Sequence, residues 1–319
     1  MMKIKLIPEK TSLPFLKSRF IAFGVSAALI VLSAVMFFGP GLNKGIDFEG
    51  GIMLEVGFNE APELGDMRSE LGDLGLGQVN LQTFGAPDDI LIRVERQEGD
   101  SEAQNVAVQT VKAKLEEMYG TDISYRRIEF VGPTVSGELV QTSFEAVLVS
   151  VLVILIYIWL RFEWHYSVGA IAALVHDVIL TMGFFVITGI EFNVASVAAI
   201  LTIVGYSIND TVVVYDRIRE NFRRYKKMEV RDLLDMSINE TLSRTVITSL
   251  TTLLALGALF IFGGEVIRGF AAAMIFGVVI GTYSSIFVAA PILLQIGLDH
   301  HNEEEDGFKP SDDLPETQS

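Results

Sequence analysis

Charged residues that interrupt long apolar runs are the strongest candidates for chemistry in this sequence. Asp210 stands in the segment Gly-Tyr-Ser-Ile-Asn-Asp-Thr at 205–211, six residues before Asp216. A rise of 1.5 Å per residue places Asp210 about 9 Å inside the end of its apolar run. Because a charge within a membrane is costly, such a residue generally faces the protein interior and marks an ion pathway. We expect Asp210 to bind and release a proton, with a fixed interhelical hydrogen bond by Asp210 or Asn209 as the alternative.

The neighbours of Asp210 suit this interpretation. Helical spacing puts small or weakly polar side chains on its face, which favours close helix contact or a water path. These are Ser196, Ala199, Ile203 and Tyr206. We expect four supporting polar residues at the site: Asn209, Tyr206, Ser207 and Thr211.

Three further titratable residues belong to this set. Arg244 opens a later apolar run, where it either anchors the helix at the membrane surface or reaches inward to the level of Asp210. His176 and Asp177 fall near the middle of another run, so Asp177 needs a partner or a proton. A second titratable site and a hydrogen bond that locks two helices both remain open there. We expect no metal site, because adjacent helical residues point apart and no third ligand is evident.

Six apolar runs must position these residues, since a membrane helix needs about 20 mostly apolar residues. The runs cover residues 20–38, 139–160, 167–188, 192–215, 244–262 and 270–296. The first follows Lys17 and Arg19 and resembles a signal peptide, but no small-x-small cleavage site follows it. We therefore expect an uncleaved membrane anchor at 20–39. Gly277 and Gly281 in the last run predict close helix packing.

Basic residues in the short connecting segments predict the orientation of the helices. The N-terminal segment 1–19, Arg161 and the connector 217–243 all fall on one side, which we expect to be cytoplasmic. The connector alternates basic and apolar residues, so we expect an amphipathic helix on anionic lipid headgroups. The acidic tail 297–319 is expected to be cytoplasmic and disordered.

The segment 40–138 is expected to lie on the other side of the membrane, as a folded domain. Its pattern predicts strands at 52–58, 79–84, 90–94 and 123–130, helices at 61–74 and 102–119, and a turn at 85–89. The order β-α-β-β-α-β is that of ferredoxin-like domains. The domain carries no histidine or nucleophile motif, and its acidic groups (Glu95, Glu98 and Asp100) predict a solvated rim rather than a cation site. We interpret it as a binding or mechanical module.

The composition excludes several classes of function. Half of the 319 residues are apolar and the net charge is -16, which argues against a nucleic-acid partner. The chain has no cysteine, so it has no disulfide and no thiol chemistry. There is no phosphate-binding loop of the ATPase type. We therefore expect a protein that is not an enzyme and uses no cofactor, with its energy supplied by an ion gradient or a partner.

Several segments in this order resemble the SecF family, the smaller membrane subunits of the bacterial SecDF protein-export complex, in the RND superfamily. The most specific block is 193–221. The others are 45–51, 131–133, His176-Asp177, 243–249 and 262–264. The resemblance implies a six-helix half-bundle completed by SecD, and a ferredoxin-like periplasmic domain. It also implies that Asp210 and Arg244 are the functional membrane charges.

The same resemblance implies that the chain works in the bacterial inner membrane beside the SecYEG channel. There it would use the proton-motive force to promote release of the exported preprotein, and sodium in place of the proton stays open. Two other classes remain: half of an exporter of small molecules or lipids, and a passive scaffold whose membrane charges serve only assembly.

Overall fold

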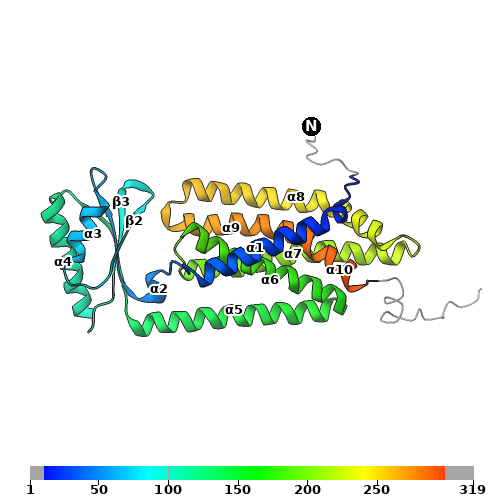
Figure 1. Cartoon of the computed structure of the whole chain (residues 1–319), viewed down its shortest axis with the longest axis horizontal. Coiled ribbons are helices and arrows are strands. Elements are labelled where there is room, and N and C mark those ends of the chain that lie inside the picture. Colours follow the sequence, from blue (N-terminus) through cyan, green and yellow to red (C-terminus); the bar gives the residue numbers. More distant parts are fainter. Residues whose placement is uncertain (1–10, 100, 299–319) are drawn as a thin grey trace, which may run out of the picture.

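The computed structural model describes residues 11–99 and 101–298. Figure 1 shows a long helix bundle with a small sheet domain (residues 46–131) at one end. The start of the first long helix lies at the opposite end of the bundle. The predictions made for residues 1–10 and for most of the acidic tail fall outside the described residues.

Six helical spans of the described residues are long and apolar enough to cross a membrane, which confirms the predicted fold class. Their helices are α1 (Arg19–Phe38), α5 (Pro133–Arg161), α6 (Trp164–Thr188), α7 (Val194–Arg224), α8 (Val230–Phe262) and α9 (Glu265–Ser284). A short 3₁₀ turn, η1 (Phe15–Ser18), precedes α1. The sixth span continues from α9 through a π-helical turn, η2 (Ser285–Ala289), into α10 (Ala290–Ile296).

Helices α6, α7 and α9 form the centre of the bundle, whereas α1, α5 and α8 expose most of their apolar side chains. The centre is close-packed because α9 presents glycines to α7. A Cβ atom at Gly277 would overlap the side chain of Ile203, and one at Gly281 would lie 3.1 Å from the Cβ of Ser207. The small residues of the last run therefore allow close approach of two backbones, as predicted.

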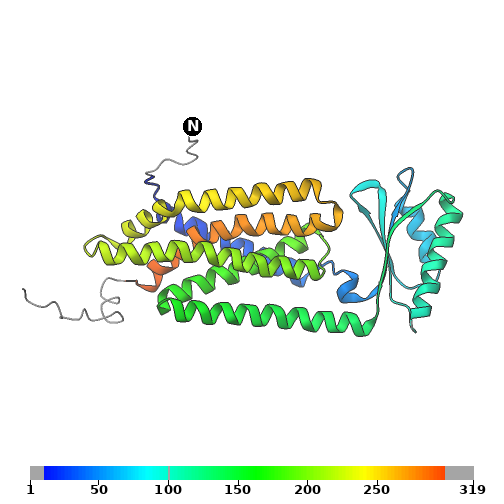
Figure 2. The ribbon, with the colours of Figure 1, turned by 180° about the vertical axis from the view of Figure 1, so that it is seen from behind.

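The connector between the fourth and fifth spans differs from the prediction. No separate helix covers 217–243, because α7 continues to Arg224, α8 begins at Val230, and only a short turn joins them. The apolar residues that suggested a membrane-surface helix are buried in the bundle core instead. They are Ile218, Phe222, Leu233, Leu234 and Ile238. The apolar faces of the two helix ends cover each other, so they form a helical hairpin that projects beyond the bundle (Figure 2).

The sheet domain contains the predicted β-α-β-β-α-β order. Its elements are β1 (Gly51–Gly57), α3 (Leu64–Gly72), β2 (Val79–Phe84), β3 (Ala86–Val94), α4 (Ser101–Tyr119) and β4 (Ser124–Val131), preceded by the single turn α2 (Ile46–Glu49). The antiparallel strands lie in the order β2-β3-β1-β4, which is the ferredoxin-like arrangement. The predicted turn at 85–89 is wrong, since β3 begins at Ala86 and only Gly85 separates it from β2. The helix predicted at 61–74 is shorter at both ends.

The sheet has two different faces. Helices α3 and α4 cover the outer face, and the opposite face is turned toward the bundle (Figure 1). The chain enters β1 through Gly50 and Gly51, whose φ angles are 72° and 117°. A Cβ at Gly51 would also lie 2.7 Å from the carbonyl oxygen of Val94. Only glycine fits this turn without strain, and it directs the chain from α2 into the central strand.

Candidate functional site in the membrane

Asp210 lies in the middle third of α7 and is buried, with 6 % of its surface exposed. The Thr245 hydroxyl of α8 donates a hydrogen bond to its Oδ1 at 2.8 Å. The other carboxylate oxygen, Oδ2, is also buried but has no hydrogen-bond partner among the described residues. A buried carboxylate with one unsatisfied oxygen is costly, and it is therefore a group that gains from binding a proton or a cation.

Asp177 on α6 is held quite differently. Its Oδ2 accepts hydrogen bonds from the hydroxyls of Ser207 on α7, at 2.5 Å, and Ser284 on α9, at 2.7 Å. Its Oδ1 lies 2.8 Å from Nδ1 of His176, so these adjacent side chains meet rather than point apart as we expected. The second ring nitrogen of His176 lies 3.1 Å from the hydroxyl of Ser26 on α1. One carboxylate thus joins the three central helices and α1, which favours the helix-locking alternative.

Arg244 does not pair with Asp210 in this structure. Its side chain is exposed, and it forms no ion pair with any carboxylate of the described residues. Consecutive helical residues differ by about 100° around the axis. Because Thr245 faces Asp210, Arg244 must point to the side. Asn209 is likewise exposed beside buried Asp210, so its hydrogen bond to another helix is not present within the described chain.

The remaining supporting residues lie along the contacts of α7 with α8 and the sixth span. Tyr206 is half-buried and donates a long hydrogen bond, 3.5 Å, to Ser249 of α8. Thr211 lies 2.9 Å from the hydroxyl of Ser285 in the π-helical turn. Ser207 binds Asp177 rather than Asp210. Of the four predicted supporting residues, only Ser207 has a hydrogen bond to an aspartate within the described chain, and that aspartate is Asp177.

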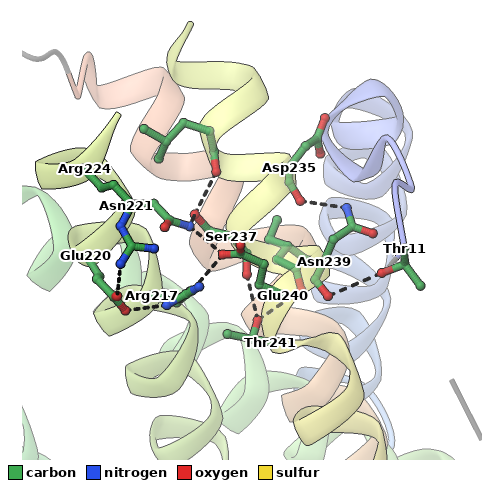
Figure 3. A network of polar contacts seen from close by, with 12 residues as sticks. Thr11, Arg217, Glu220, Asn221, Arg224, Asp235, Ser237, Asn239, Glu240 and Thr241 are labelled. Atoms are coloured by element: carbon green, nitrogen blue, oxygen red, sulfur yellow. Dashed lines mark hydrogen bonds and ion pairs between the residues drawn. The ribbon is translucent and has the colours of Figure 1, made fainter. Parts of the chain in front are cut away.

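The ends of α7 and α8 outside the predicted spans form a polar cluster that fixes the two helices together (Figure 3). Glu240 of α8 accepts hydrogen bonds from Nε of Arg217 and from Nδ2 of Asn221, both at 2.7 Å. Asn239 of α8 binds both the backbone N–H and the carbonyl of Leu13 at 2.9 Å. Asp235 accepts the N–H of Leu16 at 2.9 Å. These contacts hold the two helix ends together and attach the segment that precedes α1 to them.

Sequence reasoning missed Thr245, Ser284, Asp235 and Asn239. Serine, threonine and asparagine on a helix are common, and their partners lie on other helices. Nothing in the spacing of one helix singles them out.

Two segments of the chain match models of known protein families. Residues 110–299 match the family model described as protein export membrane protein SecD/SecF, C-terminal, and residues 35–62 match the SecD/SecF GG motif, which contains the Gly50-Gly51 turn. The chain belongs to the SecD/SecF family. Similar curated members are the protein translocase subunits SecF of Rickettsia akari, 47 % identical, and of Rickettsia felis, 46 % identical. Each comparison covers 91 % of this chain and 94 % of the relative.

Members of the SecD/SecF family with solved structures have the same fold. The crystal structure of SecDF from Thermus thermophilus, a translocon-associated membrane protein, superposes with a TM-score of 0.81 at 34 % identity, over 91 % of this chain. SecDF in the super-membrane-facing form gives 0.65 at 32 % identity, over 93 %. The chain spans about two fifths of the length of these SecDF chains, 39 % and 40 %. The protein is therefore a multi-pass membrane member of a protein-export family.

Proposed function

We propose that this chain acts as the SecF-type subunit of a protein translocase, which together with SecD uses the proton-motive force to drive late steps of preprotein export. The bundle would lie in the bacterial inner membrane with both termini in the cytoplasm and the sheet domain in the periplasm. The basic hairpin formed by α7 and α8 supports that orientation, since positive residues favour the cytoplasmic side. The relatives named as SecF subunits support the partnership with SecD.

The observation that carries the proposal is the half-satisfied carboxylate of Asp210. Ionised, it holds α8 through Thr245 and has a free oxygen for a cation, either the Arg244 guanidinium after a rotation of α8 or a group of SecD. Protonated, it no longer attracts a cation and α8 can repack. Such a cycle moves the protein only if the two conformations differ in proton affinity. The few buried contacts of the membrane half of α8 favour this helix as the part that moves.

The remaining steps are part of the same proposal. The SecYEG channel would deliver the preprotein, and the sheet domain would bind it in one conformation and release it in the other. The subunit itself performs no covalent chemistry and needs no cofactor, because the gradient supplies the energy. Anionic lipids would contact the basic ends of the hairpin, and no nucleic acid takes part.

The test is preprotein export into inverted membrane vesicles, with and without an imposed gradient. Asp210→Asn should leave the complex with SecD assembled and abolish the stimulation by the gradient. Thr245→Val, which removes the hydrogen bond at nearly equal volume, should reduce the stimulation. Thr248→Val is the matched control, because Thr248 bonds only to carbonyls of its own helix. Full stimulation with Asp210→Asn would refute the proposal, and stimulation by a sodium gradient alone would replace the proton by sodium.

A further inference from the structure

The sheet domain is attached to the start of α7 at a single compact joint. The loop between α6 and α7 (residues 189–193) lies beside the segment 43–45 that leads from α1 into the sheet domain. Gly45 donates its N–H to the carbonyl of Phe192 at 2.9 Å, and Phe192 donates to the carbonyl of Asn43 at 2.8 Å. The Asn43 side chain donates to the carbonyl of Gly189 at 2.8 Å. Backbone hydrogen bonds thereby join two segments that are distant in sequence.

Two charged side chains of the sheet domain complete this joint. Arg93 projects from the bundle-facing side of β3 and forms an ion pair with Glu191 of the loop, with both side chains largely buried. The same guanidinium donates to Oδ1 of Asn43 at 3.0 Å. The carboxylate of Asp47, in α2, accepts the N–H of Val194 at 3.0 Å. Val194 is the first residue of α7, so Asp47 satisfies one of the free N–H groups at the start of that helix.

Beside the joint, the sheet and the bundle are separated. A cavity of about 340 Å³ lies between them. Its sheet wall includes Met53, Gln82 and Phe84, and its bundle wall includes Ser196, Phe260 and Ala272. Besides the joint, the direct continuation of β4 into α5 and the packing of α2 against α5 attach the domain to the bundle.

We propose that Arg93, Glu191 and Asp47 are positioning residues that fix the sheet domain to the start of α7, so that the domain follows movements of the helix that carries Asp210. The part of this inference that concerns movement rests on the proposed function. Asp210 lies 16 residues after Val194 on one continuous helix, a rise of about 24 Å. A helix of that length transmits a tilt or a shift at Asp210 directly to its first turn, where Asp47 and Glu191 hold the domain.

The experiment measures the position of the domain and the export activity separately. The chain has no cysteine, so Gln82→Cys and Ala272→Cys introduce one thiol on each wall of the cavity. The yield of a short bis-maleimide cross-link between them reports the position of the domain in the assembled complex. A protease site in the turn 225–229 separates the two thiols, so that cross-linked fragments stay joined after cleavage. The same complexes, without the two cysteines, are assayed for gradient-stimulated export.

Charge reversal tests the ion pair. Arg93→Glu or Glu191→Arg alone should lower the cross-linking yield and abolish the gradient stimulation, and the double reversal should restore both. Arg96→Glu is the matched control, because Arg96 is exposed just after β3 and outside the joint. Asp47→Ala should behave like a single reversal. Asp47→Asn keeps an acceptor oxygen and should behave like the wild type.

Several outcomes would overturn the inference. Wild-type cross-linking in both single reversals, or no recovery in the double reversal, would show that the pair does not position the domain. Reduced cross-linking with undiminished gradient stimulation would show that the joint does not transmit movement. If the wild-type complex itself shows no stimulation, the proposed function fails, and the positioning role is then decided by the cross-linking yields alone.

Discussion

Asp177 and Asp210 are both buried carboxylates, and the same substitution at the two positions tests how differently they are held. Asp177→Ala leaves two groups without an acceptor, the hydroxyl of Ser207 and the Nδ1 group of His176. The Ser284 hydroxyl can still donate to the carbonyl of Gly281 at 3.1 Å. Asp210→Ala leaves one, the hydroxyl of Thr245. The atoms removed are identical, so the cavity created and the relief of carboxylate burial largely cancel in the comparison.

The difference therefore comes from one additional unsatisfied group at position 177. A buried donor that loses its partner costs about 1–3 kcal/mol. Asp177→Ala should consequently lower the free energy of unfolding by about 1–3 kcal/mol more than Asp210→Ala does. Asp177→Asn should lower the free energy of unfolding less than Asp177→Ala does. The amide oxygen still accepts hydrogen bonds from two hydroxyls, and the histidine can change its tautomer.

The assay is unfolding of the purified protein in mixed micelles by increasing SDS, followed by circular dichroism. Gradient-stimulated export is measured on the same variants. We expect Asp177→Ala to reduce export only in proportion to the folded protein that remains, and Asp210→Ala to abolish stimulation in a stably folded protein. An equal or smaller loss of stability at position 177 would refute the interpretation of Asp177 as a lock between helices.

Two more predictions concern packing and attachment. Gly277→Ala should lower the free energy of unfolding by about 1–3 kcal/mol in the same SDS assay, because the new Cβ overlaps Ile203; Gly257→Ala, where no atom lies within 4 Å, should not destabilise the protein. Asn239→Ala should speed proteolysis of the N-terminal segment, whereas Asp232→Ala, an exposed site on the same helix, should leave the cleavage rate unchanged.

The sequence was sufficient for the features that depend on one segment at a time. Apolar runs of about 20 residues predicted all six spans of the described chain, since a helix satisfies its backbone hydrogen bonds within one segment. Alternating and helical periodicities predicted the order of the sheet domain. The spacing of Gly277 and Gly281 predicted the close contact between α9 and α7, because small residues four positions apart let two helix backbones come close together.

Features that depend on contacts between two segments could not be predicted from the sequence. The apolar face of residues 217–243 looks the same whether it covers lipid or another helix, and here it covers its own partner in the hairpin. Asp210 was located correctly in its helix, but the side chain that faces it from α8 is Thr245 and not Arg244. Neighbouring residues differ by about 100° around the helix axis, so the rotation of α8 about its axis decides which of the two faces Asp210. Packing among the helices sets that rotation. The joint residues Arg93 and Glu191 lie 98 positions apart, and neither has a local pattern that marks it.

The attachment of the first helix has a consequence for how the protein is made. Leu13 and Leu16 are bound by Asn239 and Asp235, which follow 226 and 219 positions later in the chain. Synthesis from the N-terminus therefore places α1 in the membrane long before the groups that hold its beginning exist. Helix α6, which also contacts α1, is made in between, and the hydroxyl of Tyr283 in α9, which donates to the carbonyl of Ala22, is made later still. Of the six described spans, α1 is thus synthesised earliest, but the contacts that hold its beginning form only after the fifth span has been made.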